Sequence, residues 1–264
     1  MKKIIITGVN SYIGKNLADL LKDKFDQYEV KLMSVKNEEW EKQDFSKYDV
    51  IVHVAGIVHQ KKNKVSQEQY IKVNAELTRE LAVKAKNEGV KQFIFLSTMS
   101  IYGEIGSLER KISIDENTLP SPQNFYGESK LLGEKYLLDL EQDNFKIYIL
   151  RPPMVYGENC PGNYNLLKKL SMYIPVFPLV DNERSAINVK VLVREIKKGI
   201  DFHLQGISLP QDDSYMNTSE LVKKMAFENG RSIYLSKVLG VMVKVFLKKT
   251  PVVKKVFGNL TYTK

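Results

Sequence analysis

Cysteine, long hydrophobic runs and clustered metal ligands are scarce in this sequence of 264 residues, and each shortage excludes a class of function. The one cysteine, Cys160, cannot form an intramolecular disulfide, a C-x-x-C metal site or a redox pair. No stretch supplies the ~18 consecutive apolar residues of a transmembrane helix. The apolar run in MKKIIITG is too short for a signal peptide. We therefore expect a cytoplasmic protein without a bound metal.

Basic residues outnumber acidic ones, 40 to 31, which gives a net charge of +9. Such a surface attracts nucleic acid, anionic lipid or phosphorylated small molecules. Because the basic residues are dispersed and not interleaved with aromatics, we expect no nucleic-acid partner. Residues 235–257 alternate apolar and lysine positions. We favour a helix packed on the core with its lysines outward, and peripheral contact with an anionic membrane is the alternative.

Short apolar runs alternate with helical patterns over the first part of the chain. Strands are expected at 2–8, 28–35, 48–56, 91–98 and 145–157, and helices after Gly14 and at 70–90 and 124–142. This alternation predicts an α/β fold with a doubly wound parallel sheet of the Rossmann type. Only about a dozen residues separate the second strand from the next, so we expect the sheet to be shortened around its third strand.

The pattern becomes irregular beyond Gly157, which indicates a small C-terminal lobe. Helices are expected at 164–172, 188–201, 218–229 and 236–248, and short strands at 205–209 and 232–235. We expect one domain to comprise residues 1–157 plus about 186–208, and the lobe to comprise 158–185 plus 209–264.

The segment ITGVNSYIGKNL places Gly8 and Gly14 between the first strand and the first helix. Glycines there let the backbone approach a pyrophosphate at the helix N-terminus, whereas a plain strand–helix turn is the alternative. Ser11 stands where a middle glycine is usual in such loops. The cofactor residues expected in this segment are Gly8, Asn10, Ser11, Tyr12, Ile13 and Gly14.

Tyr126 and Lys130 in YGESK stand four residues apart, so on a helix they project from one face. A lysine ammonium beside a phenol lowers the pKa of the tyrosine, which can then exchange a proton with an alcohol. Thr98 ends the strand in FLSTMSIYG, at the sheet edge where ligands of such folds bind. We predict that Thr98, Tyr126 and Lys130 are catalytic; an exposed Tyr–Lys pair and a loop-capping Thr98 are the alternatives.

These motifs, in this order, resemble the extended short-chain dehydrogenase/reductase family, the NAD-dependent epimerases and dehydratases of nucleotide sugars. The resemblance spans residues 1 to about 190 and rests on TG-x-x-x-x-I-G, HVAG, Asn74, STMSIYG, Y-x-x-x-K and RPPMVYG. The segments CPGNYNLLKKL and FGNL are similar to a branch that makes capsule and O-antigen sugars. That branch includes reductases of UDP-4-keto-6-deoxy-N-acetylhexosamines.

The resemblance implies a dinucleotide-binding sheet domain, a substrate-binding lobe and NAD or NADP as cofactor. It assigns the adenine to Asp44, the ribose to Ala55 and Gly56, and the nicotinamide ribose to Lys130. Further cofactor residues implied are Asn74, Pro153 and Met154. No acid follows the second strand; Ser34 or Lys36 would accept a 2′-phosphate there, which favours NADPH. Met99-Ser100 replaces the Asp-Glu of the family's dehydratases, which disfavours dehydration.

For substrate, the resemblance assigns the UDP phosphates to Arg184, whose alternative is an ion pair with Glu183 or Asp181, and adds Asn163. The first hypothesis is a reductase acting at C4 of a UDP-4-keto sugar. The second is a UDP-hexose 4-epimerase with bound NAD, and the third a catalytically silent dinucleotide sensor. A homodimer through helices near 70–88 and 124–142 is also implied. His53 and His59 are expected to be hydrogen-bonded residues rather than metal ligands.

Overall fold

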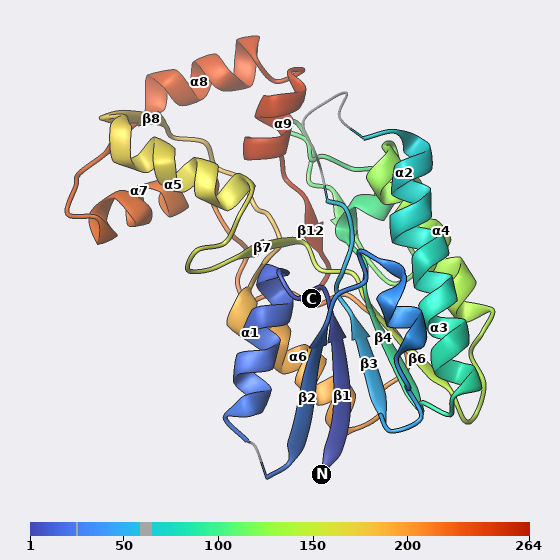
Figure 1. Cartoon of the computed structure of the whole chain (residues 1–264). Helices are drawn as coiled ribbons and strands as arrows, with labels where there is room; N and C mark the ends of the chain where they lie inside the picture. The colour runs from blue at the N-terminus through green and yellow to red at the C-terminus, as the bar shows by residue number, and fades with distance from the viewer. Residues whose placement is uncertain (25, 59–64) are drawn as a thin grey trace. The chain divides into compact units, whose positions relative to one another are not determined.

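A computed structural model describes residues 1–24, 26–58 and 65–264 (Figure 1). The chain forms two compact units, which we call the first and the second unit. The first unit comprises residues 1–103, 120–152 and 189–210, and the second comprises 104–119, 153–188 and 211–264. His59 lies outside the described residues.

A six-stranded parallel sheet in the order β10-β6-β4-β3-β1-β2 forms the centre of the first unit. Its strands are β1 (Lys2–Thr7), β2 (Tyr28–Met33), β3 (Val50–His53), β4 (Gln92–Leu96), β6 (Lys146–Leu150) and β10 (Gly206–Ser208). Between β2 and β3 the chain forms only the short helix η1 (Glu38–Lys42), and β3 pairs with β1 on the side away from β2. The fold class and the shortening around the third strand are confirmed.

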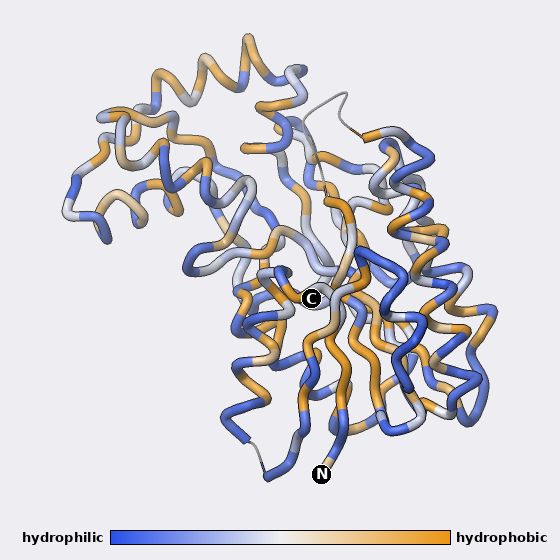
Figure 2. Tube along the Cα trace, in the orientation of Figure 1, coloured by the Kyte–Doolittle hydropathy of each residue, from blue (hydrophilic) through white to orange (hydrophobic). Residues whose placement is uncertain are grey.

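Helices cover both faces of this sheet. On one face α1 (Tyr12–Lys22) contacts α6 (Val189–Asp201). On the other lie α2 (Gln67–Ile71), α3 (Leu77–Asn87) and α4 (Phe125–Leu138). Because both faces are covered, the inner strands β1, β3, β4 and β6 are mostly apolar, as the orange colour in Figure 2 shows, whereas the edge strand β2 carries charged residues. Phe45, Phe93 and Phe145 are each fully buried in the core beneath α3 and α4.

Two of the expected elements are interrupted. The helix expected over 70–90 contains a π-helical turn at Lys72–Glu76, between α2 and α3. The strand expected over 145–157 is split into β6 and β7 (Met154–Tyr156), because Pro152 and Pro153 lack the N–H groups that a strand ladder needs.

The second unit has its own core and three small parallel strand pairs. These are β7 with β9 (Ala186–Asn188), β8 (Val176–Pro178) with β11 (Tyr234–Ser236), and β5 (Ser113–Ile114) with β12 (Thr261–Tyr262). Its helices are α5 (Asn163–Tyr173), α7 (Thr218–Glu228), α8 (Lys237–Phe246) and α9 (Pro251–Phe257). The core contains Leu167, Phe177, Val222, Met225, Val243 and Phe257.

The division differs from the expected one at residues 153–157 and 104–119, and by a few residues at 186–188 and 209–210. Residues 153–157 belong to the second unit, because β7 pairs with β9 there. Residues 104–119 belong to it as well, because β5 pairs with β12 near the C-terminus. Both pairings join segments far apart in the sequence, which local patterns do not reveal.

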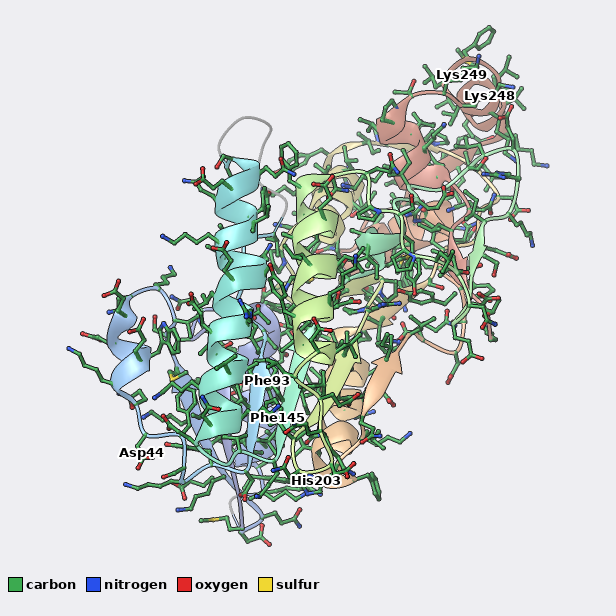
Figure 3. The ribbon with its side chains drawn as sticks, turned by 90° about the vertical axis from the view of Figure 1, so that its right-hand side faces the viewer. Asp44, Phe93, Phe145, His203, Lys248 and Lys249 are labelled. Carbon is green, nitrogen blue, oxygen red and sulfur yellow. The ribbon has the colours of Figure 1, made fainter. Side chains whose placement is uncertain are left out.

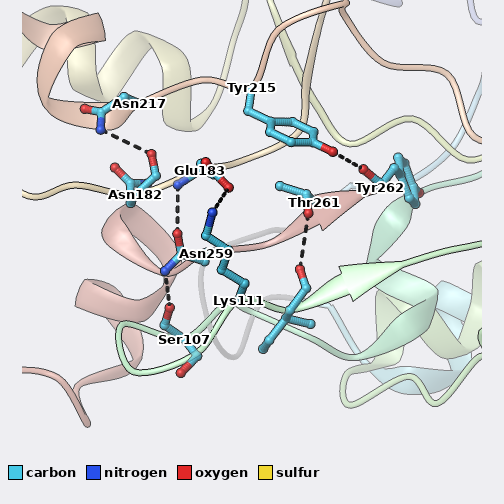
Figure 4. A network of polar contacts seen from close by, with 10 residues as sticks. Ser107, Lys111, Asn182, Glu183, Tyr215, Asn217, Asn259, Thr261 and Tyr262 are labelled. Atoms are coloured by element: carbon cyan, nitrogen blue, oxygen red, sulfur yellow. Dashed lines mark hydrogen bonds and ion pairs between the residues drawn. The ribbon is translucent and has the colours of Figure 1, made fainter. Parts of the chain in front are cut away.

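Polar contacts hold the segment around Glu183 in the second unit (Figure 4). The Glu183 amide donates to Asn259 Oδ1 at 2.8 Å, and Asn259 Nδ2 donates to the Ser107 carbonyl at 3.1 Å. The Glu183 carboxylate pairs with Lys111 at 2.8 Å. The stretch from Ser107 to Lys111 and the one around Asn259 are thereby joined to the segment around Glu183.

Candidate active site

The loop after β1 has the close backbone packing that a pyrophosphate-binding turn requires. Gly8 adopts φ +82°, and a Cβ there would lie 3.2 Å from the Ala55 Cα. At Gly14 a Cβ would lie 3.0 Å from the Val54 side chain. Ser11 caps α1, because its hydroxyl accepts a hydrogen bond from the Gly14 amide at 3.2 Å. The serine at the usual glycine position therefore does not distort the turn, and the cradle fits a dinucleotide phosphate at the helix N-terminus.

Asn74, in the π-helical turn, fixes the loop that follows β3. Its side chain accepts from the Ile57 amide at 2.8 Å and donates to the Ile57 carbonyl at 2.9 Å and to the Ser129 hydroxyl at 3.0 Å. A Cβ on Gly56 would lie 2.8 Å from Asn74 Oδ1 and 3.3 Å from Lys130 Nζ. Asn74 therefore positions the backbone at Gly56 and Ile57, directly after Ala55; Ala55 and Gly56 were expected to line the ribose.

Thr98 and Tyr126 meet beyond the carboxyl end of β4. Asn124 caps α4 by accepting from the Gly127 amide at 2.9 Å. A Cβ at Gly127 would lie 2.7 Å from the Ser100 carbonyl, so only glycine allows α4 to begin this close to the strand end. Burial raises the pKa of Tyr126 to about 12, although a hydrogen bond with Thr98 opposes the rise. The phenol is therefore protonated at neutral pH.

Lys130 is buried one helical turn after Tyr126, with 4% of its surface exposed. Its Nζ donates to the Leu96 carbonyl at 2.9 Å and lies 4.5 Å from the centre of the Phe95 ring. Burial lowers the pKa of Lys130 to about 8, and the Glu134 carboxylate partly opposes this. The expectation that Lys130 lowers the pKa of Tyr126 is wrong for this structure, because desolvation dominates at the phenol.

A buried ion pair lies on the same face of α4 and was missed from the sequence. Glu134 and Arg151 are 1% and 7% exposed, and Arg151 Nη2 donates to Glu134 Oε2 at 2.6 Å. Ser97 donates to the same carboxylate, and Arg151 Nη1 donates to the Tyr102 hydroxyl at 2.8 Å. The hydroxyls of Ser97 and Tyr102, which flank Thr98 in the sequence, therefore bond the Glu134–Arg151 pair, whereas the hydroxyl of Thr98 bonds Tyr126. Tyr126, Lys130 and Glu134 stand at i, i+4 and i+8, which places all three on one face of a helix. This spacing was the sequence signal that could have indicated a role for Glu134 near the site.

Asp44 does not lie with the expected cofactor residues. It is exposed, and its carboxylate accepts from the Ser46 amide at 3.0 Å. The next residue, Phe45, donates its amide to Glu88 at the C-terminal end of α3. Figure 3 shows Asp44 toward the same end of the sheet as His203, which precedes β10. This is the amino edge of the sheet, so the assignment of Asp44 to the adenine is wrong.

Ser34 does follow β2 at the carboxyl edge, where the Gly8 amide donates to the Met33 carbonyl at 2.9 Å. The Ser34 hydroxyl accepts a hydrogen bond from the Lys36 amide at 3.4 Å. Ser34 is therefore beside the phosphate loop, where the 2′-substituent of a dinucleotide was expected. Its role stays a prediction.

Four predicted residues belong to the second unit. Pro153 precedes β7, Met154 begins it, and Asn163 is the first residue of α5. Arg184 donates from Nη1 to the backbone carbonyls of Gly258, Lys254 and Ile105 at 2.6, 3.3 and 3.5 Å. Glu183 pairs with Lys111 instead, and no described carboxylate lies within ion-pair distance of Arg184. The ion-pair alternative for Arg184 is therefore not realised within the described residues.

His53 is a buried, hydrogen-bonded residue. Its Nδ1 lies 2.8 Å from the Thr7 hydroxyl and its Nε2 3.1 Å from the Thr78 hydroxyl. Burial lowers the pKa of His53 to about 3, so the ring is neutral. Within the described residues no group of three or more His, Cys, Asp or Glu side chains is placed to hold a metal ion. Nor is any described helix both long and apolar enough to cross a membrane.

Comparisons with known proteins give the class of enzyme. Residues 4–177 match the NAD dependent epimerase/dehydratase family. The chain is 28% identical over 288 residues to a UDP-glucose 4-epimerase of Vibrio cholerae, covering 98% of this chain and 86% of the relative. It is 26% identical over 240 residues to a UDP-2-acetamido-2,6-beta-L-arabino-hexul-4-ose reductase of Pseudomonas aeruginosa, covering 87% of this chain and 58% of the relative.

The fold is similar to that of a dTDP-4-dehydrorhamnose reductase from Bacillus anthracis in complex with NADP. The TM-score is 0.74 at 24% identity, and the alignment covers 89% of this chain and 83% of that one. The fold and site thus define an NAD(P)-dependent enzyme of the nucleotide-sugar epimerase and reductase class. The chain belongs to the NAD dependent epimerase/dehydratase family, and its cofactor is NAD or NADP.

Proposed function

We propose that this enzyme reduces the C4 keto group of a UDP-4-keto-6-deoxy-N-acetylhexosamine for surface-polysaccharide synthesis. The supporting observation is the Tyr126 phenol, hydrogen-bonded to Thr98 at the carboxyl edge of the sheet, with Lys130 one helical turn away and bonded to the Leu96 carbonyl at 2.9 Å. Reduction of a ketone needs a proton donor at O4, whereas oxidation of an alcohol needs a base. The Tyr126 phenol can give that proton, and Met99-Ser100 stands where the family's dehydratases carry Asp-Glu.

In the proposed reaction the reduced nicotinamide, when bound, supplies the hydride for C4. Tyr126 donates its proton to O4, so the ketone becomes an alcohol. Thr98, which hydrogen-bonds Tyr126, helps to hold O4 in line with the phenol. Lys130 stands between the Leu96 carbonyl and Gly56 and is proposed to bind the nicotinamide ribose.

The direct test is turnover of UDP-4-keto-6-deoxy-N-acetylglucosamine, UDP-N-acetylglucosamine and UDP-glucose, each with NADPH or NADH. We expect stoichiometric loss of cofactor absorbance with the keto sugar alone, and product NMR showing a new C4 hydroxyl. Interconversion of UDP-glucose and UDP-galactose without net cofactor change would establish the alternative, a UDP-hexose 4-epimerase. That alternative is favoured by the Vibrio cholerae relative, whose match covers 98% of this chain.

Arg184 is proposed to bind the UDP diphosphate. Burial lowers its pKa to about 10, which still leaves the guanidinium charged at neutral pH and without a carboxylate partner among the described residues. Gly106, at φ +99°, leaves room for Nη1, since a Cβ there would lie 2.9 Å from that atom. A half-buried guanidinium without a carboxylate partner can make strong charge-assisted bonds to phosphate oxygens.

Replacing Arg184 with Lys is expected to raise the KM for the UDP-sugar about tenfold or more, because a guanidinium–phosphate contact is worth ~1.5–3 kcal/mol. The KM for the cofactor should not change. Lys111→Gln, which removes an exposed cation from the same polar network, is the matched control. An unchanged KM for the UDP-sugar combined with a lowered Tm would show that Arg184 only joins backbone segments.

Two other expectations remain predictions. The homodimer is expected through the helices near 70–88 and 124–142, which correspond to α2, the π-helical turn, α3 and α4. The silent dinucleotide sensor is the less favoured alternative, because Thr98 follows β4, and Tyr126 and Lys130 on α4 bond Thr98 and the Leu96 carbonyl at the end of that strand.

A further inference from the structure

An exposed apolar stripe runs along α8. Val238, Val241, Met242, Val245 and Phe246 follow the spacing i, i+3, i+4, i+7 and i+8, which places them on one side of a helix. Their exposed fractions are 71%, 61%, 48%, 56% and 76%. Single exposed apolar residues are ordinary, but a contiguous stripe marks an interaction surface. We call these five residues the α8 stripe.

The rest of the second unit fixes which side of α8 faces outward. A Cβ on Gly240 would lie 2.0 Å from the Leu179 carbonyl oxygen, so the helix packs at backbone contact on the residue after β8. Val243, on the same side, is buried in the second unit's core, and Ser236 caps the helix through the Leu239 amide at 3.2 Å. Turning the α8 stripe inward would break this packing. From the sequence we favoured a packed helix with its lysines outward. The outward side of α8 carries the apolar α8 stripe as well as lysines.

The stretch of chain that carries the α8 stripe is rich in basic residues. Residues 229–264 contain eight basic side chains and no Asp or Glu. Lys237 and Lys244 border the stripe on α8 and are exposed, and Lys248 and Lys249 project from the turn that follows it (Figure 3). Lys248 pairs with Glu109 at 2.6 Å, whereas Lys249 is exposed.

This combination selects one kind of partner. A second copy docked on the same face would set lysine against lysine, since the symmetric contact is made by identical patches. An anionic lipid surface satisfies both features, because apolar side chains enter the acyl boundary while flanking lysines meet the headgroups. We propose that the α8 stripe and its flanking lysines dock this protein onto membranes containing anionic lipid. The proposal goes beyond the sugar chemistry and does not depend on it.

Co-sedimentation with vesicles tests this without substrate. We expect the protein to pellet with phosphatidylcholine vesicles containing phosphatidylglycerol, far less with phosphatidylcholine alone, and less as salt is raised. The variant Val241→Gln/Val245→Gln should lower the partition coefficient about tenfold or more, because it removes apolar surface. Lys244→Gln/Lys249→Gln should lower it similarly.

Matched controls come from α7 of the same unit. Phe227→Gln removes an apolar side chain that is 81% exposed, and Lys223→Gln/Lys224→Gln removes two exposed lysines. Both should bind vesicles as the unaltered protein does. Equal loss in the α7 controls, or no binding to anionic vesicles, would overturn the proposal. So would sedimentation velocity showing that the α8 variants dissociate a dimer, since a second copy would then cover the stripe.

Discussion

Replacing Tyr126 with Phe is expected to lower kcat for sugar conversion by about 10²–10⁴-fold, the usual contribution of a positioned acid or base. The change removes only the hydroxyl that hydrogen-bonds Thr98 and would protonate O4. Cofactor binding should persist, because the phosphate loop at Gly8 and Gly14 lies on a different element. The measurement is steady-state turnover of the keto sugar, together with a dinucleotide titration.

Tyr136→Phe is the matched control, since Tyr136 lies on the same helix and contacts Arg79 rather than the strand ends. It should retain turnover within about twofold, as surface substitutions usually do. If Tyr126→Phe proved as active as the unaltered enzyme, the proton would come from another group. The proposed reaction would then fail, and the cofactor-binding fold would remain.

Replacing Arg151 with Met is expected to lower the free energy of unfolding by about 3–5 kcal/mol, because Glu134 would be left buried without its cation. Glu134 is 1% exposed and accepts from Arg151 Nε and Nη2. The double variant Arg151→Met/Glu134→Leu should recover most of the loss, since apolar groups replace both charges. Urea unfolding of the single and double variants measures both effects.

Lys224→Met supplies the comparison, because Lys224 and Glu228 form an exposed pair at 4.0 Å. Loss of this exposed pair should lower the free energy of unfolding by at most about 0.5 kcal/mol. A loss at Arg151 no larger than that would mean that the Arg151–Glu134 ion pair contributes little to the stability of the fold. Ser97, which donates to Glu134, would then be the principal partner of that carboxylate.

Local patterns were enough to predict the sheet and the central part of the site. Strand ends at Gly8 and Thr98 and the helix carrying Tyr126 and Lys130 each follow from a short stretch of sequence. The shortened third-strand region followed from a count of residues between two strands. Features of this kind depend on neighbours along the chain, which is why they could be read from the sequence.

Features that depend on distant segments were not predictable in this way. Asp44 was assigned by its order in a motif, yet the short β2–β3 connection places it at the amino edge of the sheet. The pKa of Tyr126 depends on burial by several elements, so the effect of Lys130 was overestimated. The outward side of α8 is set by contact between Gly240 and Leu179, which lie on separate elements.

The short connection between β2 and β3 has one more consequence, for aggregation. It leaves β2 as an edge strand of the sheet, and an edge strand offers unpaired backbone N–H and C=O groups to other chains. Glu29 and Lys31 place charges along that strand, and Lys31 bonds Gln43 just after η1 at 2.5 Å. Trp40 of η1 is buried in the core beside the strand. The segment around η1, which replaces a missing strand, thus also disfavours pairing of this edge strand with another protein chain.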